Sequence, residues 1–400
     1  MIKVAVMGYG TIGSGVVEVL EKNSESIAEH AGEPIEVKYV LDLRDFPGDP
    51  IESKVVHDYK VIAEDPEVAI VVETMGGVEP AYTFVKEILL AGKSVTTSNK
   101  ALVAEKGAEL IRIAREREIN FQFEASVGGG IPIIRSVYKS LTADVIEEVS
   151  GILNGTTNYM LTAMSEKGAS YEDVLKEAQS LGYAERDPSA DVEGYDACRK
   201  IAILTSLVAG YQVDYQDIHT EGITGIKPED FRYAKKLNRR IRLIASSKKT
   251  GDTYSALVAP FLVAEDHPLY TVNGVFNAVF IHGNMLGDAM FYGSGAGKLP
   301  TASAVVADVI DMAKHHDPQR NIPMQWREEK LELADYREAG YRFLVRSSSS
   351  ENEIREAFGE LEKVDGGVPG EIGFVTGEMT EAEFEERSKK IKLIGRMRLK

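Results

Sequence analysis

The 400-residue chain is long enough for two or three domains with separate cores, since 44% of its residues are hydrophobic. Its formal net charge of −17 argues against nucleic acid and anionic membranes as partners, because both select basic surfaces. The chain opens on an apolar run without an export signal, and its longest apolar stretch, residues 201–211, is too short to cross a bilayer. One cysteine, Cys198, allows no internal disulfide. We therefore expect a cytoplasmic protein that binds small molecules.

Residues 1–130 alternate short Val/Ile-rich runs with segments of helical periodicity. This alternation is typical of a parallel sheet in the α/β class, doubly wound with helices on both faces. The strand-like runs are 2–7, 35–42, 68–74, 93–98 and 119–126.

Beyond residue 131 the pattern changes to longer helices mixed with strand-like runs. We expect an α+β domain over 131–299, a helix at 300–318 that completes the first domain, and a linker over 319–340. A small α+β unit over 341–400 follows, and its first helix is expected to run over 351–363.

The motif GYGTIG at residues 8–13 follows the first strand and opens a helix, which is the context of the dinucleotide-binding fingerprint. It predicts a Rossmann-type domain that binds NAD or NADP. The acidic residue expected about 20 residues later is missing, and Asp42 comes after a longer loop. Asp42 would favour NAD, whereas Arg44 would meet the 2′-phosphate of NADP, so the choice stays open. The expected cofactor contacts here are Gly8, Gly10, Thr11, Ile12, Gly13, Asp42 and Arg44.

Further turns fall at the carboxyl ends of later strands, where ligands bind in open α/β sheets. The turn at 73–80 predicts cofactor contacts from Thr74, Met75 and Gly76, and the turn at 124–132 is rich in glycine. Ser98 or Asn99 would cap a helix whose first turn holds Lys100. A cation there is disfavoured by the helix dipole, so we expect Ser98 and Lys100 to face cofactor or substrate; a solvent-exposed lysine is the alternative.

The stretch 182–200 gathers carboxylates before a strongly apolar helix. Asp196 and Lys200 are four residues apart and share a helix face, with Cys198 nearly opposite. Because the helix continues into residues too apolar to face water, we expect a buried pair rather than a surface ion pair. Lys200 can then donate a proton to a carbonyl oxygen as hydride reaches the carbon.

Glu185 and Asp196 would hold a substrate ammonium, which favours an amino-acid substrate. Gly155 and Thr156 would offer amides to its carboxylate at a helix start, although the surrounding NGTTN also reads as an ordinary helix cap. The seven histidines show no metal-binding spacing, so we expect no catalytic metal.

Eight ordered motifs resemble homoserine dehydrogenases across about residues 1–320. They lie at 8–13, 71–81, 92–104, 123–134, 151–161, 181–200, 219–223 and 291–308. The resemblance implies reversible NAD(P)H-dependent reduction of L-aspartate 4-semialdehyde to L-homoserine, in threonine and methionine biosynthesis. It also implies a homodimer or higher oligomer formed through the second domain.

The resemblance further implies roles for particular residues. Lys100 and Lys200 would be the catalytic lysines, and Glu185 and Asp196 would bind the substrate amino group beside Tyr183, Gly155 and Thr156. Gly297 would add a cofactor contact. A monovalent cation such as Na⁺ would lie at Glu124, Val127, Gly129 and Ile131.

The unit at 341–400 resembles a shortened ACT regulatory domain, but SSSSENEI replaces the turn expected after its first strand. This departure argues against threonine feedback and leaves assembly as its role. Two other functions remain open. Aspartate-semialdehyde dehydrogenase would need a cysteine nucleophile, which Cys198 does not suit because it points away from Lys200. A non-catalytic NAD(P)-binding sensor is the second alternative.

Overall fold

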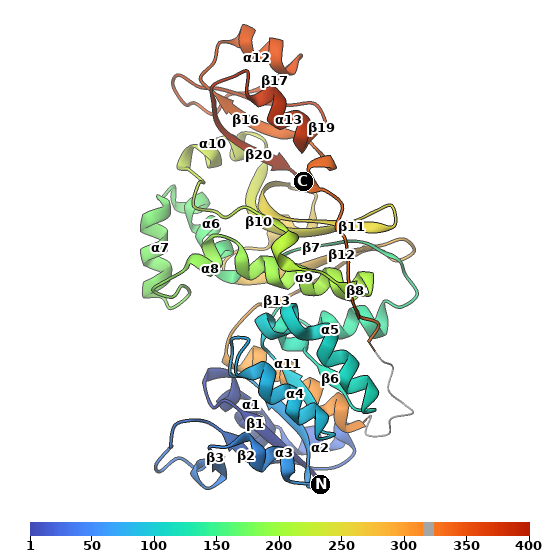
Figure 1. Cartoon of the computed structure of the whole chain (residues 1–400). Coiled ribbons are helices and arrows are strands. Elements are labelled where there is room, and N and C mark those ends of the chain that lie inside the picture. Colours follow the sequence, from blue (N-terminus) through green and yellow to red (C-terminus); the bar gives the residue numbers. More distant parts are fainter. Residues whose placement is uncertain (315–323) are drawn as a thin grey trace. The chain divides into compact units, whose positions relative to one another are not determined.

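The computed structural model describes residues 1–314 and 324–400 (Figure 1). These residues form two compact units. The first unit contains the described residues of Met1–Asp144, Ala202–Tyr215 and Gly293–Leu331, and the second contains Val145–Ile201, Gln216–Tyr292 and Glu332–Lys400. The end of the expected helix at 315–318 and the start of the expected linker at 319–323 lie outside the described residues.

The first unit is built on a parallel sheet with the order β3-β2-β1-β4-β5-β6. This is the order of doubly wound dinucleotide-binding domains, and it reverses between β1 and β4, where such domains bind their ligand. The α/β, Rossmann-type prediction is therefore confirmed. Its strands are β1 (Ile2–Met7), β2 (Ile35–Leu41), β3 (Val55–Val56), β4 (Val68–Glu73), β5 (Ser94–Thr97) and β6 (Phe121–Gln122).

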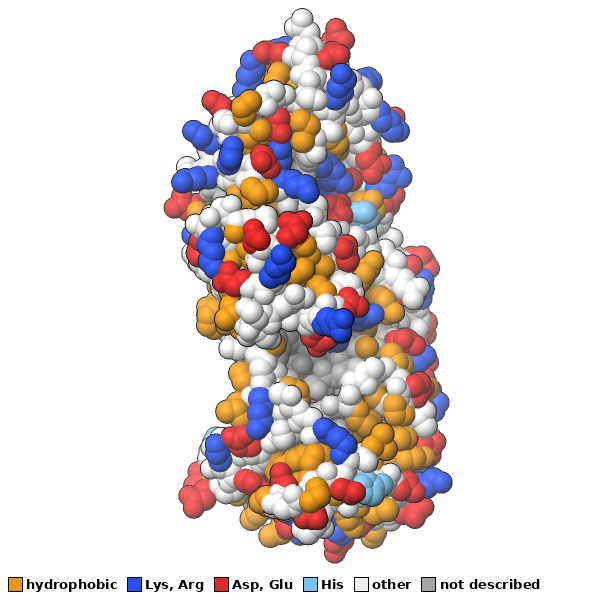
Figure 2. All heavy atoms as spheres, turned by 90° about the vertical axis from the view of Figure 1, so that its left-hand side faces the viewer, with side chains coloured by type: hydrophobic (Ala, Val, Ile, Leu, Met, Phe, Trp, Pro, Cys, Tyr) orange, Lys and Arg blue, Asp and Glu red, His pale blue; other side chains and the backbone are white. Residues whose placement is uncertain are grey.

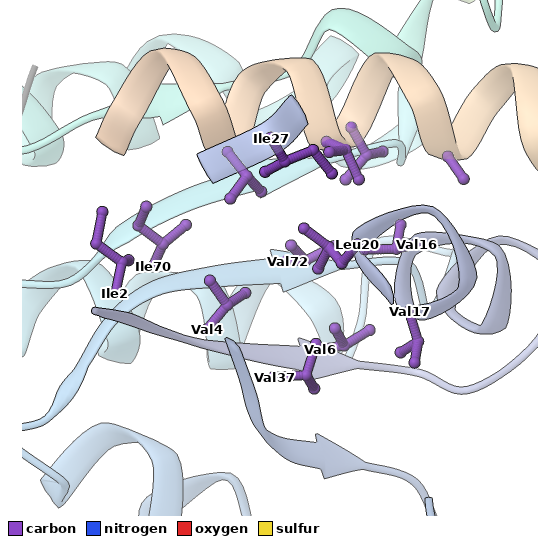
Figure 3. Packing of buried hydrophobic residues seen from close by; sticks show 14 of the residues in the cluster. Ile2, Val4, Val6, Val16, Val17, Leu20, Ile27, Val37, Ile70 and Val72 are labelled. Atoms are coloured by element: carbon purple, nitrogen blue, oxygen red, sulfur yellow. The ribbon is translucent and has the colours of Figure 1, made fainter. Parts of the chain in front are cut away.

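Helices α1 and α11 pack against each other beside this sheet, over a core of buried aliphatic side chains (Figure 3). Gly15 permits this close approach, since a Cβ there would lie 3.0 Å from the Lys298 carbonyl oxygen. Val4, Val6 and Val16 are fully buried in the core, and each contributes about 1.5–3 kcal/mol. The helices of the first unit are α1 (Thr11–Lys22), α2 (Ser24–Ala31), α3 (Tyr59–Glu64), α4 (Ala81–Leu90), α5 (Lys100–Glu116) and α11 (Lys298–Lys314).

The second unit is built on a mixed sheet with the order β13-β12-β7-β10-β11-β20-β16-β18-β17, and β9 (His219–Thr220) also pairs with β11. The strands on the main path are β7 (Ile146–Ile152), β10 (Arg239–Thr250), β11 (Thr253–Ala264), β12 (Phe276–Gly283), β13 (Gly287–Ser294), β16 (Phe343–Ser347), β17 (Glu362–Val364), β18 (Ile372–Val375) and β20 (Leu393–Leu399). The accompanying helices are α6 (Gly155–Lys167), α7 (Tyr171–Ser180), α8 (Ser189–Val192), α9 (Tyr195–Ala209), α10 (Pro228–Lys236), α12 (Glu351–Phe358) and α13 (Glu381–Ser388). Helix α9 starts in the second unit, and its residues from Ala202 onward count with the first.

In residues 340–400, the C-terminal module, β15 (Gly340–Tyr341) and β19 (Met379–Thr380) form a short separate pair. The other elements follow the order strand, helix, strand, strand, helix, strand, with the sheet order β20-β16-β18-β17. This is the ferredoxin-like arrangement. Strand β20 also pairs in parallel with β11, so the module's sheet continues the larger sheet (Figure 1). The helix expected over 351–363 is too long: α12 ends at Phe358, because Gly359 has a φ of +82° and 362–364 form a strand.

Residues 131–144 and 202–215, expected in the second domain, belong to the first unit. Part of the reason is an ion pair between Arg135 and buried Asp308 of α11, at 2.7 Å. No described helix has both the length and the apolar composition needed to span a membrane. Acidic and basic side chains are interspersed over the face in Figure 2.

Candidate functional site

The loop after β1 has the backbone geometry that a dinucleotide pyrophosphate requires. Gly8 has a φ of +95°, and a Cβ at Gly13 would lie 1.8 Å from the Gly8 carbonyl oxygen, so no side chain fits there. A Cβ at Gly10 would meet nothing within 4 Å, which leaves that backbone open. Helix α1 begins at Thr11 and Ile12 without a side-chain cap, so its first amides can bind phosphate.

Asp42 and Arg44 meet at the carboxyl end of β2. The Asp42 carboxylate accepts hydrogen bonds from the Tyr9 amide at 2.8 Å and from Arg44 Nε at 2.9 Å. The hydrogen bonds from Arg44 outweigh partial burial and hold the pKa of Asp42 well below its usual range. The Arg44 side chain is 62% exposed. An acid and an accessible guanidinium therefore lie together beside the glycine-rich loop.

Glu73, at the end of β4, organises the next two loops and is absent from the sequence-based site. Its fully buried carboxylate accepts from the Met75 amide at 2.7 Å, from the Gly76 amide at 3.4 Å and from the Thr97 hydroxyl. Burial raises the pKa of Glu73. The position of this acid at the end of an apolar run, just before a glycine-rich turn, was the signal that the sequence offered.

Lys100 is the first residue of α5, which is capped by Asn99. Asn99 accepts from the Leu102 amide at 3.1 Å, and its amide group donates to the Gly77 carbonyl. The turn that contains Thr74, Met75 and Gly76 is thereby tied to the segment that carries Ser98 and Lys100. These predicted cofactor contacts lie together at one edge of the sheet.

The glycine-rich turn at 124–132 packs on the loop before α11. A Cβ at Gly129 would lie 2.6 Å from the Gly295 carbonyl oxygen, and the Gly130 amide donates to Ser294 at 3.1 Å. Gly297 has a φ of +119° and is exposed one residue before α11. The glycines here serve close backbone packing.

The side chain of Glu124 is already engaged by protein groups. It accepts from the Ile134 amide at 2.9 Å and from the Arg135 amide at 2.8 Å, and the Ile131 carbonyl accepts from Ile133 at 2.9 Å. In the described ranges, no three His, Cys, Asp or Glu side chains are grouped as metal ligands. A cation at this turn would therefore depend on backbone carbonyls, such as those of Val127 and Gly129.

In the second unit, Asp196 and Lys200 form a buried ion pair on α9. Lys200 Nζ lies 2.7 Å from Asp196 Oδ2 and 2.7 Å from the Leu153 carbonyl oxygen. The side chain of Lys200 is 10% exposed and that of Asp196 is 4% exposed, so the pair is held in a low-dielectric environment. Two of the three ammonium protons are used by these contacts. Cys198, between the two residues in sequence, is also buried.

Asn154 orients this pair, although the sequence pattern indicated only a helix cap there. Its side-chain oxygen accepts from the Thr157 amide at 2.9 Å, which caps α6. Its side-chain nitrogen donates to Asp196 Oδ2 at 2.9 Å and to Asp191 Oδ1 at 2.7 Å. The start of α6 and the start of α9 are thus joined through one amide.

Three other predicted substrate contacts lie together at the start of α6. Thr156 follows Gly155 in the first helical turn, and its hydroxyl donates to the Tyr183 carbonyl at 2.6 Å. The Tyr183 ring contacts Tyr159 edge-on, at 4.9 Å between centroids. Glu185 lies exposed on the same loop as Tyr183, and its backbone carbonyl accepts from Gln179. The structure shows no bond between Glu185 and the Asp196–Lys200 pair.

The parallel sheet with its open glycine-rich loop defines a dinucleotide-binding protein, and the buried lysine suits an NAD(P)-dependent oxidoreductase. Two family models match the chain: "Homoserine dehydrogenase, NAD binding domain" over residues 8–124 and "Homoserine dehydrogenase" over 132–310. Together they cover most of its length. The chain therefore belongs to the homoserine dehydrogenase family.

Relatives and solved structures agree with this assignment. The homoserine dehydrogenase of Pseudomonas aeruginosa is 42% identical over 80% of this chain and 75% of its own length, and that of Bacillus subtilis is 42% identical over 78% and 73%. The crystal structure of a Thiobacillus denitrificans homoserine dehydrogenase matches with a TM-score of 0.91 at 34% identity, covering 100% of this chain and 98% of that one. A hyperthermophilic archaeal homoserine dehydrogenase in complex with NADPH matches with a TM-score of 0.68 at 27% identity, over 81% and 99%. The chain is thus an NAD(P)-dependent oxidoreductase of amino-acid biosynthesis, and neither alternative function is favoured.

Proposed function

We propose that Lys200 is the acid–base group of the reversible reduction of L-aspartate 4-semialdehyde to L-homoserine. The observation that carries this role is its geometry: a buried ammonium held by Asp196 and by the Leu153 carbonyl, each at 2.7 Å. The third N–H can donate to the substrate carbonyl oxygen. In the reverse direction the amine accepts the hydroxyl proton, and Asp196 stabilises the charged lysine that results.

The substrate's own charges suit residues near this pair. Glu185 and Asp196 would hold its ammonium group, with Glu185 exposed on the loop after α7. The first amides of α6, from Gly155 and Thr156, would bind its carboxylate, because a helix start favours an anion. Tyr183 would cover the site, and Lys100 would act as the second catalytic lysine.

The bound nicotinamide coenzyme supplies or accepts the hydride. Its pyrophosphate would bind the loop of Gly8, Gly10 and Gly13 and the first amides of α1. Thr74, Met75, Gly76, Ser98 and Gly297 would contact the remainder. We propose that Arg44 binds the 2′-phosphate of NADP, because its guanidinium is accessible while Asp42 is neutralised by it.

Assembly, cation binding and location complete the proposal. Strand β13 is the sheet edge and exposes Met290 and Tyr292, with Tyr292 stacked on Phe276 at 5.2 Å, so we propose a homodimer through this face. Sedimentation equilibrium tests it.

A monovalent cation such as Na⁺ would sit on the carbonyls of the 124–131 turn, and a change of activity with Na⁺ at constant ionic strength tests that. The free thiol of Cys198 suits the cytoplasm, and cell fractionation tests that location. We propose that the C-terminal module is ACT-like, on the evidence of its strand order. Calorimetric titration with amino acids tests whether it binds an effector.

The function is tested by incubating the purified chain with L-homoserine and either NAD or NADP and following nicotinamide absorbance. We expect reduction of the coenzyme that depends on both substrates, with a higher kcat/KM for NADP. Absence of turnover with either coenzyme, in protein that still binds them, would contradict the proposed activity and favour a sensor.

A further inference from the structure

The conspicuous motif at residues 219–223 has no part in the mechanism above. Its first two residues form β9, which pairs with β11 through His219 opposite Leu257 and Thr220 opposite Val258. The next residue, Glu221, donates its amide to the Val258 carbonyl at 2.7 Å. The backbone of this segment is therefore fixed to the sheet of the second unit.

The side chain of Glu221 binds two arginines of the C-terminal module. Arg398 Nη2 donates to Glu221 Oε1 at 2.6 Å and Nη1 to Oε2 at 3.1 Å, while Arg396 Nη2 lies 3.3 Å from Oε1. Arg398 is 1% exposed and also bonds to fully buried Glu381 at 2.9 Å. Burial alone would raise the pKa of Glu221, but His219 and the arginines outweigh it and lower that pKa. Arg398 therefore bridges two carboxylates, and loss of Glu221 would remove one of the two that compensate its buried guanidinium.

The opposite side of the same segment packs on the residues that lead into α9. A Cβ at Gly222 would lie 2.3 Å from the Val192 carbonyl oxygen, and one at Gly194 would lie 3.0 Å from Thr220 Cγ2. The Ile223 amide also donates to Val192 at 2.8 Å. At Gly222 backbone therefore meets backbone, and at Gly194 the backbone meets the methyl groups of Thr220 and Val258.

This contact lies at the first turn of the helix that carries the proposed acid–base group. The Gly194 carbonyl accepts from the Cys198 amide at 2.9 Å, and Asp196 follows Gly194 by two residues. A displacement of residues 192–194 would move Asp196, and Lys200 with it.

We propose that Glu221 is a positioning residue that ties the C-terminal module to the start of α9 and so fixes the Asp196–Lys200 pair. Its effect on catalysis rests on the proposed function of Lys200. The C-terminal module then belongs to the catalytic scaffold, because its arginines hold the segment on which α9 starts.

The test compares Glu221→Gln with Glu371→Gln. Glu371 is a matched control, because it also pairs with a buried arginine of the module, Arg346, at 2.7 Å, but does not contact the 219–223 segment. In Glu221→Gln we expect kcat to fall on the order of tenfold to a hundredfold with an unchanged KM for the coenzyme, since small misplacements of reacting groups cost rates of that order. Glu371→Gln should keep the kcat of the unmodified chain.

Hydrogen exchange provides a readout that does not use activity. We expect the amides of residues 192–200 to exchange faster in Glu221→Gln than in Glu371→Gln. Arg396→Gln should also speed exchange at residues 192–200, but less, because Arg396 is 24% exposed. This variant serves as the test if Glu221→Gln does not fold. Equal effects of the Glu221 and Glu371 changes, or unchanged exchange at 192–200, would overturn the proposal. If exchange is faster in Glu221→Gln and Lys200→Met is fully active, the link from Glu221 to the start of α9 stands and the role of Lys200 is refuted.

Discussion

Asn154 donates to Asp196 Oδ2 at 2.9 Å, the same oxygen that lies 2.7 Å from Lys200 Nζ. The side-chain oxygen of Asn154 meanwhile caps α6 through the Thr157 amide. One amide group therefore fixes both the helix that would bind the substrate carboxylate and the acid that orients the lysine. The cap is a local contact, whereas the bond to Asp196 joins residues 42 positions apart in the sequence.

Replacing Asn154 separates these two roles. We expect Asn154→Ala to lower the free energy of unfolding by about 1 kcal/mol, as the loss of a helix cap does, and to lower kcat. Asn154→Ser should keep most of the cap, but its shorter side chain with a single donor cannot serve Asp191 and Asp196 together, so part of the stability should recover while its kcat stays low. Denaturant unfolding and steady-state kinetics on both variants measure this; a kcat that recovers with stability would contradict the orienting role.

Arg44→Ala should change the coenzyme preference. Without the guanidinium, a 2′-phosphate loses a charge-assisted partner, which raises the KM for NADP on the order of tenfold or more. Asp42 is then released from its pair and can accept from the ribose hydroxyl of NAD. The ratio of kcat/KM for the two coenzymes is the measurement, and an unchanged ratio would show that Arg44 does not read the 2′ position.

Stability of the first unit should depend on pH through Glu124. Burial and the nearby charge of Asp308 raise the pKa of Glu124, and burial raises that of Asp308. A carboxyl group with a raised pKa in the folded state stabilises fully below its unfolded value of about 4.3, and this contribution is lost as the pH rises through the folded value. The free energy of unfolding should therefore decline between about pH 4.3 and about pH 7.

Glu124→Gln should flatten that decline, whatever its effect on absolute stability. Trp326 is the only tryptophan and is buried in the first unit, so its fluorescence follows urea unfolding there. Asp311→Asn is the control: the pKa of Asp311 is lowered, because burial is outweighed by the hydrogen bond from Lys139, so its loss should leave the decline in place. An unchanged slope in Glu124→Gln would contradict the assignment.

Replacing Glu118 by glycine should stabilise the folded protein. It has a φ of +57° just after α5, a conformation that costs a non-glycine residue about 1 kcal/mol. Glu118→Gly should raise the urea midpoint, by an amount reduced by the greater backbone freedom of glycine in the unfolded chain. Asn238→Gly is the comparison, because Asn tolerates its φ of +51° and should gain less. Equal shifts would show that the strain at Glu118 is small.

The local patterns of the sequence were sufficient for the first unit. Strands β1 and β4 are short and apolar, and each is followed by a glycine-containing turn, so the alternating pattern of the parallel sheet and the glycine-rich loop could be predicted from neighbouring residues. The pair Asp196 and Lys200 was equally accessible, because four residues on one helix define a face.

What the sequence did not indicate depends on segments far apart in the chain. The continuous sheet arises from β11 pairing with β20, and the burial of Glu73, Asp308 and Glu221 arises from partners on other elements. Such residues read as ordinary polar positions until their partners are known. The early end of α12 was a local error, because Gly359 carried the signal.

The most direct measurement of the central claim is kcat for L-homoserine oxidation by Lys200→Met, with coenzyme affinity measured on the same protein. The account predicts a fall in kcat on the order of 10³-fold, because the proton acceptor is lost, with coenzyme binding unchanged and with Cys198→Ala fully active as the control. A Lys200→Met protein that turns over within about threefold of the unmodified chain, a change too small for the loss of a general base, would contradict the account.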